Sequence, residues 1–354
     1  MRPKYRGDWE SATRFPVGLR FVGGVIGSKL VLWGGTQRQQ QDGEKQLLPS
    51  NFVYTFIPPG LSDNAKGAWK KIPKIGDVHP NRNKAAFTTL NNLIYIFGGF
   101  KRRKYKNTIT SLSADGNFTR LPITGNIPYP LFFAQAWSYN NKIYIFGGQV
   151  ESRATNDEHD FTKEVYCFDP STNNIVRLET KGTPPSPRAW FAVAQIDYRV
   201  FIHGGKGCVE KRKRCLLSDF FTLDLNTLEW RKINESGISD GLAFHSLSSV
   251  SSSELLLVGG FDNSNQISHR IATFDINKEE WRERERLPAL SGSNKDEEGL
   301  MKHQTFEVQK EYSTLIICVG GFVDREQSRH PKRMAIFNFP SQNKTTTNRP
   351  PKIK

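Results

Sequence analysis

Ile143-Tyr-Ile-Phe-Gly147-Gly148 is a short run of β-branched and aromatic residues that ends in a glycine pair, and this pattern occurs six times in the 354 residues. The other copies are Leu30-Val-Leu-Trp-Gly34-Gly35, Ile94-Tyr-Ile-Phe-Gly98-Gly99, Val200-Phe-Ile-His-Gly204-Gly205, Leu255-Leu-Leu-Val-Gly259-Gly260 and Ile316-Ile-Cys-Val-Gly320-Gly321. The mean spacing between the first glycines is about 57 residues. A strand-rich repeat of this length indicates a propeller or a solenoid.

Each repeat contains more than this one strand. A second apolar run precedes the glycine pair and is joined to it by a tight polar turn such as Asn91-Asn92, which predicts a hairpin. After the pair, an apolar residue is followed seven positions later by a large one, as in Phe168 to Ile175, Leu223 to Trp230 and Phe274 to Trp281, with Ser111 before Phe118 as a polar exception. Four antiparallel strands per repeat make one propeller blade, and the glycines suit close backbone approach near its axis.

The order of a hydrophobic run, a glycine pair, Phe-Asp and then Trp resembles the kelch repeat over nearly the whole chain. The resemblance implies an all-β fold, a six-bladed kelch β-propeller over residues 1–340. No fourth-strand Trp follows Phe337, whereas Trp9 precedes the first repeat. Because propellers avoid unpaired edges by closure, we expect an N-terminal strand with Trp9 to complete the last blade. Residues 341–354 are predicted to be a basic disordered tail.

Composition excludes several classes of protein. Lys and Arg number 50 against 35 Asp and Glu, a net charge of +15. No apolar run approaches the roughly 20 residues of a membrane helix, and the first residues lack the apolar segment of a secretory signal. Four cysteines do not make a disulfide scaffold. We therefore expect a cytoplasmic and/or nuclear protein with no membrane partner.

The basic charge gathers on one face of the predicted propeller. Loops between second and third strands share that face and are net positive, whereas the third-to-fourth corners on the other face are net negative. The densest clusters are residues 101–106 and 206–214. A concave basic mouth would attract an anionic partner. Each cluster alone is equally well explained as a solvated loop, and nucleic acid is disfavoured because few aromatic residues interleave. The run 211–214 also matches what nuclear import machinery reads.

No motif for catalysis, cofactor binding or metal coordination is present, so the sequence predicts a protein that is not an enzyme, with no cofactor and no metal site. Cys208 and Cys215 fit no common zinc spacing and are interpreted as an exposed thiol pair. His203 and His245 are interpreted as satisfied core histidines. The acidic cluster 157–160 is interpreted as a solvated loop.

Residues 185–205 and 244–261 resemble one subgroup of kelch proteins, the substrate receptors of cullin-RING ubiquitin ligases that capture C-terminal degrons. The resemblance implies a mouth that holds a terminal carboxylate through two arginines and a Ser-Trp pair. Those positions fall on Lys206 and Lys211, and on Ala243-Phe244. Lysine keeps the charge without the bidentate fork of arginine. Family members that join a ligase carry a helical box that binds an elongin adaptor. No such box follows Phe339 in this sequence, so the sequence offers no adaptor box to support binding of elongin or cullin subunits.

The function predicted from the sequence is a protein-interaction module. Its basic face would bind an acidic segment of a partner protein, or its C-terminal carboxylate, as a substrate receptor or adaptor for ubiquitin ligation. The predicted ligand-binding residues are Lys206, Lys211, Arg212, Phe244, Arg102 and Arg103. One alternative is a non-catalytic scaffold that binds cytoskeletal or chromatin proteins through the blade sides. The other is an enzyme built on a propeller.

Overall fold

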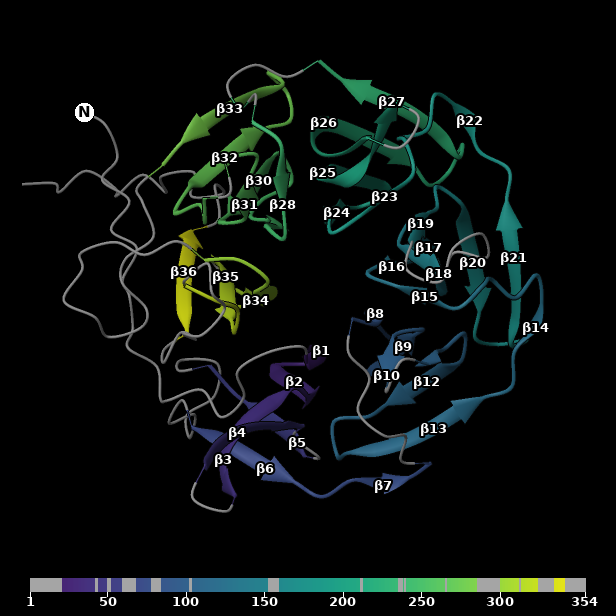
Figure 1. Cartoon of the computed structure of the whole chain (residues 1–354), viewed down its shortest axis with the longest axis vertical. Coiled ribbons are helices and arrows are strands. Elements are labelled where there is room, and N and C mark those ends of the chain that lie inside the picture. Colours follow the sequence, from purple (N-terminus) through teal and green to yellow (C-terminus); the bar gives the residue numbers. More distant parts are fainter. Residues whose placement is uncertain are drawn as a thin grey trace, which may run out of the picture.

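Six sheets of sequential antiparallel strands stand around a central axis in the computed structural model (Figure 1). The structure describes residues 21–41, 44–49, 52–58, 68–77, 84–101, 104–151, 159–210, 213–234, 238, 240–264, 266–284, 300–311, 313–323 and 334–340. No helix occurs among these residues. The predicted all-β kelch propeller is confirmed.

The six sheets are called blades 1 to 6 in chain order, and their strands are given from the axis outward. Blade 1 contains β1 (Phe21–Ile26), β2 (Lys29–Gly34), β5 (Val53–Phe56) and β6 (Trp69–Ile72). Blade 2 contains β8 (Ala86–Leu90), β9 (Leu93–Phe97), β12 (Ile109–Leu112) and β13 (Asn117–Leu121). Blade 3 contains β16 (Gln135–Tyr139), β17 (Lys142–Phe146), β20 (Val165–Asp169) and β21 (Asn174–Leu178). Blade 4 contains β24 (Ala192–Ile196), β25 (Arg199–Glu210), β26 (Lys213–Asp224) and β27 (Glu229–Ile233). Blade 5 contains β29 (Ser246–Ser249), β30 (Glu254–Val258), β32 (Ile271–Asp275) and β33 (Glu280–Glu283). Blade 6 contains β34 (Gln304–Lys310), β35 (Ser313–Val319) and β36 (Ala335–Pro340).

Shorter strands join and extend the blades. Three linkers, β7 (Ile75–Gly76), β14 (Thr124–Gly125) and β22 (Lys181–Gly182), pair in parallel with the outer strand of the following blade. The pieces β15 (Leu131–Phe132), β23 (Arg188–Ala189) and β28 (Leu242–Ala243) precede the inner strands of blades 3 to 5. The remaining strands lie in the loops after the glycine pairs: β3 (Thr36–Gln41), β4 (Glu44–Pro49), β10 (Phe100–Lys101), β11 (Lys104–Tyr105), β18 (Gln149–Glu151), β19 (His159–Phe161) and β31 (Phe261–Asp262).

The predicted seven-residue spacing corresponds to direct cross-strand neighbours. Phe168 lies opposite Ile175, Leu223 opposite Trp230, and Phe274 opposite Trp281, and all six side chains are buried between the blades. Blade 2 differs from the prediction, because Leu112 rather than Ser111 lies opposite Phe118. The corner there is one residue shorter, so the apolar pairing is kept at a spacing of six.

Blade 6 has three strands among the described residues, with β36 at its outer edge. Phe337 lies opposite Ile316, the register that Phe56 and Leu30 have in blade 1. Trp9 and the predicted tail 341–354 lie outside the described residues, so closure of this blade by the N-terminus stays a prediction.

In the glycine pairs of blades 2 to 5, the first glycine leaves room for a group of the next blade. A Cβ on Gly147 would come within 2.8 Å of the ring of Phe191, which belongs to the next blade. A Cβ on Gly205, the second glycine of blade 4, would come within 2.8 Å of the Cβ of the same Phe191. Both glycines have positive φ, at 65° and 100°. The first glycine of the pair therefore marks a close contact between consecutive blades, and the second, at Gly205, a close contact within blade 4.

Candidate functional site

One residue with a left-handed backbone stands two positions before the inner strand of each of blades 2 to 6. These residues, here called the mouth ring, have φ between 56° and 63° and are Lys84, Phe133, Trp190, Phe244 and Lys302. The sequence predicts unbroken inner strands such as 132–139. The structure corrects this, because Phe133, Trp190, Phe244 and Lys302 interrupt the runs 132–139, 189–196, 243–250 and 301–308. The side chains of all five residues line the central opening. A left-handed non-glycine residue costs on the order of 1–3 kcal/mol and persists only where its surroundings hold it.

Backbone hydrogen bonds between neighbouring blades hold the mouth ring. The N–H of Phe133 donates to the carbonyl of Lys84 at 2.8 Å. The N–H of Phe244 donates to the carbonyl of Trp190 at 2.9 Å, and the N–H of Lys302 donates to that of Phe244 at 3.0 Å. The strained conformation is thus tied to the packing of one blade on the next.

Three aromatic side chains of the mouth ring pack on one another. The rings of Trp190 and Phe244 stack with centroids 4.5 Å apart, and Phe133 meets them edge-on at 5.6 Å and 5.7 Å. The spacings are those of favourable aromatic pairs. Blades 3, 4 and 5 thereby form an apolar half of the mouth.

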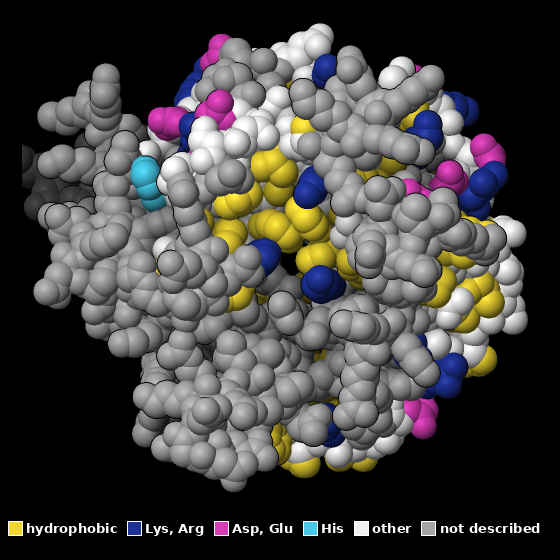
Figure 2. All heavy atoms as spheres, in the orientation of Figure 1, with side chains coloured by type: hydrophobic (Ala, Val, Ile, Leu, Met, Phe, Trp, Pro, Cys, Tyr) yellow, Lys and Arg dark blue, Asp and Glu magenta, His cyan; other side chains and the backbone are white. Residues whose placement is uncertain are grey.

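Three lysines lie over the faces of these three rings. The Nζ of Lys84 is 4.6 Å from the Phe133 centroid, that of Lys206 is 4.8 Å from Trp190, and that of Lys302 is 4.7 Å from Phe244. Cation–π contacts of this kind contribute about 0.5–2 kcal/mol each and hold the ammonium groups in place. Figure 2 shows hydrophobic side chains beside Lys and Arg groups around the central opening.

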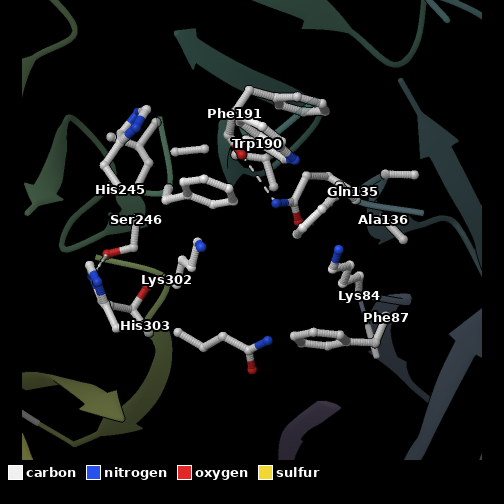
Figure 3. A pocket seen from close by; sticks show the side chains of 18 of the residues that line it. Lys84, Phe87, Gln135, Ala136, Trp190, Phe191, His245, Ser246, Lys302 and His303 are labelled. Atoms are coloured by element: carbon white, nitrogen blue, oxygen red, sulfur yellow. Dashed lines mark hydrogen bonds between the residues drawn. The ribbon is translucent and has the colours of Figure 1, made fainter. Parts of the chain in front are cut away.

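A central cavity of about 570 Å³ lies behind the mouth ring. Lys84 and Lys302 extend toward its centre from opposite sides, with Trp190 and Phe191 on a third side (Figure 3). Its wall is formed mainly by small and apolar residues of the inner strands, and none of the described lining residues is Asp or Glu. The volume falls in the range that accommodates a small ligand or a few residues of a peptide.

A row of buried histidines lies directly beneath the mouth ring. Nδ1 of His203 is 2.9 Å from Nε2 of His245, and Nε2 of His303 is 2.8 Å from Oγ of Ser246. Burial lowers the pKa of His203 to about 4 and that of His303 to about 3, and it lowers the pKa of His245 well below 6.5. The prediction that His203 and His245 are core residues is confirmed by their burial and mutual hydrogen bond. They are only partly satisfied, because Nε2 of His203 and Nδ1 of His245 have no hydrogen-bond partner among the described residues.

The Ser246–His303 contact has the geometry of a nucleophile and its base. A base of such low pKa is a poor proton acceptor, and an orienting third group is also required. Among the described residues, Nδ1 of His303 has no hydrogen-bond partner. The pair therefore does not support nucleophilic catalysis.

The structure brings two of the predicted site residues together. Lys206 and Phe244 both contact the ring of Trp190. Lys211, Arg212, Arg102 and Arg103 lie outside the described residues. Ala243, at the position of the implied serine, is fully buried in a pairing with Phe261.

Sequence reasoning missed four of the residues that shape the mouth: Lys84, Phe133, Trp190 and Lys302. A signal was available, because all of them stand at the same distance from the inner strand of their repeats. Three of them, Lys84, Phe133 and Trp190, also stand 14 residues before the first glycine of their repeat.

Other predicted features have the following outcomes. Cys167 and Cys318 are buried, as small apolar residues of strands would be, and burial raises the pKa of both thiols. Cys215 is half-buried rather than exposed as predicted, and its strand position lies opposite Gly207, while that of Cys208 lies opposite Arg214. In the described part of the chain, no three His, Cys, Asp or Glu side chains are grouped to bind a metal ion. A search of that same part for a helix that could cross a bilayer found none.

Comparison with known proteins supports the fold. The family model described as "KLHDC2/KLHL20/DRC7 Kelch-repeats domain" matches residues 23–260 and 155–350. Kelch domain-containing protein 2 of Bos taurus is 29% identical over 281 residues, which cover 72% of this chain and 66% of that protein. Kelch domain-containing protein 1 of Mus musculus is 26% identical over 265 residues, covering 68% of this chain and 62% of that protein. The chain thus spans slightly less than two thirds of these relatives. The solved structure of YjhT aligns with a TM-score of 0.66 at 16% identity, over 92% of this chain and 96% of the other.

The prediction that the protein is not an enzyme needs correction. A matched relative from Thlaspi arvense, 23% identical over 288 residues that cover 74% of this chain and 77% of its own, is named N-(sulfonatooxy)prop-2-enimidothioate sulfolyase. Missing motifs were a poor guide because one fold hosts unrelated activities at sites assembled from distant residues.

The six repeats, the ring of sheets and the family match over most of the chain agree, and the protein belongs to the kelch-repeat family.

Proposed function

We propose that the mouth of this kelch propeller binds an acidic segment of a partner protein, through side-chain carboxylates or the C-terminal carboxylate. The observation that carries the proposal is the alternation of three lysines with three packed aromatic rings in one opening. Kelch domains mediate interactions between proteins, which agrees with a peptide ligand.

The two halves of the mouth suit an amphipathic anion. Apolar groups of the ligand would pack on Phe133, Trp190 and Phe244, while its carboxylates would accept hydrogen bonds from the lysines. A hydrogen bond to a charged group contributes about 1.5–3 kcal/mol, and it is stronger beside low-dielectric walls than in open water. Because lysine is a point charge with rotatable donors, the site would tolerate more than one carboxylate geometry.

The test is binding of fluorescein-labelled peptides followed by fluorescence anisotropy. The probes are a glutamate- and phenylalanine-rich octapeptide with a free C-terminus, the same peptide with an amidated C-terminus, and a version with every glutamate replaced by glutamine. We expect Lys84→Gln and Lys302→Gln each to weaken binding of the first probe about tenfold and to flatten its salt dependence.

Lys278→Gln is the matched control, since Lys278 is exposed at the corner between β32 and β33. The proposal is wrong if the Lys84 and Lys302 variants bind as the Lys278 variant does, or if the glutamine peptide binds as well as the glutamate peptide. The amidated probe separates recognition of a chain end from recognition of side-chain carboxylates.

We also propose that the partner is delivered to ubiquitin ligation, with this protein as substrate receptor or adaptor. The support is the resemblance of residues 185–205 and 244–261 to receptors of that class. Affinity purification with mass spectrometry, with and without proteasome inhibition, tests it. Enrichment of elongin or cullin subunits is the expected result, and their absence in both conditions would contradict it.

A further inference from the structure

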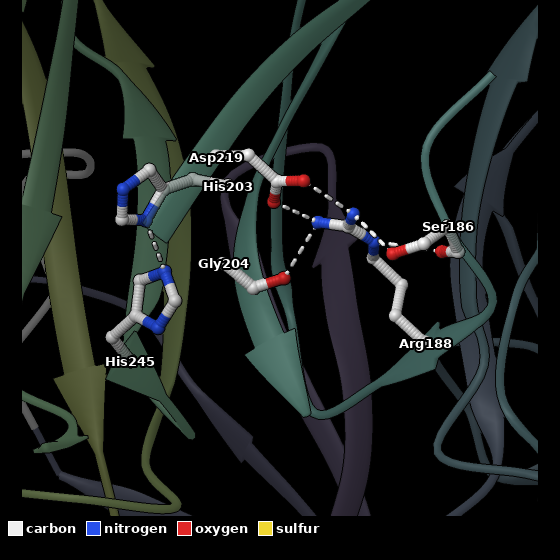
Figure 4. Close-up of polar contacts among 6 residues, drawn as sticks. All are labelled: Ser186, Arg188, His203, Gly204, Asp219 and His245. Carbon is white, nitrogen blue, oxygen red and sulfur yellow. Dashed lines mark hydrogen bonds and ion pairs between the residues drawn. The ribbon is translucent and has the colours of Figure 1, made fainter. Parts of the chain in front are cut away.

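Arg188 is a fully buried cation that does not line the central cavity. Its side chain is 0% exposed, and each of its five N–H groups has an acceptor. Nη1 and Nη2 donate to the two carboxylate oxygens of Asp219 at 2.5 Å and 2.8 Å, Nη1 also donates to the carbonyl of Gly204 at 3.0 Å, and Nε and Nη2 donate to Ser186 (Figure 4).

The acceptors lie where the β25–β26 ladder is irregular. His203 pairs with Phe220, but Gly205 pairs with Leu217, so Gly204 faces the two residues Ser218 and Asp219 across a β-bulge. A bulge redirects the strand that carries it. The Arg188 guanidinium spans the irregularity, because it binds a backbone carbonyl on one strand and a carboxylate on the other.

The strands beyond the bulge carry part of the mouth. Lys206 lies two residues after Gly204 and pairs through its backbone with Ala189, while Gly207 pairs with Arg188 itself. Trp190 follows Ala189 directly. Lys206 is therefore two residues from Gly204, whose carbonyl the guanidinium binds, and Trp190 is two residues from Arg188 itself.

Arg188 also joins blades 3 and 4 through its backbone. Its carbonyl accepts a hydrogen bond from the N–H of Gly148 at 2.8 Å, and its N–H donates to the carbonyl of Thr162 at 3.2 Å. A buried ion pair adds little net stability compared with apolar residues of the same volume, so geometry explains this pair better than stability does.

We infer that the Arg188–Asp219 pair is the positioning element that aims Lys206 over Trp190 at the mouth. This inference rests on the proposed function for its binding readout. Neither residue lines the cavity. Their effect on ligand binding passes through the direction of the β25–β26 hairpin beyond the bulge.

The first experiment is a double-mutant cycle measured with the glutamate-rich octapeptide. Asp219→Asn keeps the shape of the side chain but removes the charge that orients the guanidinium. In the wild-type background, Lys206→Gln and Lys302→Gln should each weaken binding about tenfold. In the Asp219→Asn background, adding Lys206→Gln should weaken peptide binding by less than about twofold, whereas adding Lys302→Gln should still weaken it about tenfold. A purely structural role would alter both lysine effects alike, and that outcome would overturn the inference.

The second experiment does not depend on a ligand. Amide hydrogen exchange of residues 205–217 should become at least tenfold faster in Asp219→Asn, while the β8–β9 hairpin keeps its wild-type rate. Unchanged exchange over 205–217 would overturn the inference whatever the peptide does. If instead neither lysine variant weakens wild-type binding but exchange responds as expected, the proposed function fails and the positioning role stands. Should Asp219→Asn not fold, Ser186→Ala removes a single acceptor of Arg188 and is expected to show the same pattern with smaller changes.

Discussion

Acidification from pH 8 to pH 5 is expected to lower the free energy of unfolding by at least about 3 kcal/mol because of the histidine row. His203, His245 and His303 are 0%, 5% and 6% exposed, and burial keeps each of them neutral in the folded state. The unfolded chain takes up a proton on each histidine below pH 6.5, whereas burial disfavours this protonation in the folded chain. Unfolding therefore binds protons, and stability falls as the pH falls.

The magnitude follows from the difference between the two pKa values of each group. A histidine with an unfolded pKa of 6.5 and a folded pKa of about 4, as for His203, or about 3, as for His303, costs about 2 kcal/mol at pH 5, so these two cost about 4 kcal/mol. The lowered pKa of His245 acts in the same direction. Glu307 acts in the opposite direction. Burial raises its pKa from 4.5 to about 6, so the folded state binds a proton first and gains about 1 kcal/mol at pH 5.

The assay is urea unfolding followed by tryptophan fluorescence at pH 8, 7, 6 and 5, with His303→Gln as the test variant. Glutamine does not titrate, and its amide can still form a hydrogen bond with Ser246. The loss of stability between pH 8 and pH 5 should shrink by about 2 kcal/mol. Ser246→Ala is the control, since it removes the 2.8 Å hydrogen bond but leaves the histidine to titrate. A His303→Gln variant with the full wild-type loss would refute the claim that burial keeps this ring neutral.

Two further predictions concern the packing of the propeller. Gly147→Ala combines a φ of 65° with a Cβ 2.8 Å from Phe191, and we expect it to lower the free energy of urea unfolding by about 3 kcal/mol or more. The control Gly27→Ala has a φ of 59° and no atom within 4 Å of the added Cβ, so it should lower this free energy by only about 1–2 kcal/mol. Equal losses would disprove the packing role of the glycine pair. If the predicted strand with Trp9 lies opposite Phe337, Trp9→Ala should lower stability by about 3–5 kcal/mol while Lys4→Ala leaves it unchanged, and a Trp9→Ala melting temperature equal to that of wild type would rule out this closure.

The kelch propeller could be predicted because its evidence is local and repeated. Each blade has a buried second strand, so runs such as 143–146 are continuously apolar. The strand ends where the next blade comes close to the backbone, and glycine fits there because it has no Cβ. The cross-strand pair Leu223 and Trp230 was readable from spacing alone, because a hairpin of fixed corner length sets it. The spacing prediction was wrong at Ser111, where the corner is one residue shorter.

The candidate site was readable only in part. Lys206 and Phe244 were identified by charge and by resemblance, but nothing in the run 132–139 revealed that Phe133 breaks it. The hydrophobic pattern of a strand reports which residues are buried and does not report the sign of φ at one position. Hydrogen bonds from the neighbouring blade decide that sign, and they involve residues remote in the chain.

The sequence by itself determined the architecture, since apolar periodicity and glycine pairs act within each repeat and six copies reinforce one another. Only the tertiary structure decided the chemistry of the mouth. Lys84 and Lys302 come from opposite ends of the chain, and they lie at one opening with Trp190 because each of blades 2 to 6 turns a left-handed residue toward the axis. That convergence depends on how the blades pack around the axis, which no single stretch of sequence encodes.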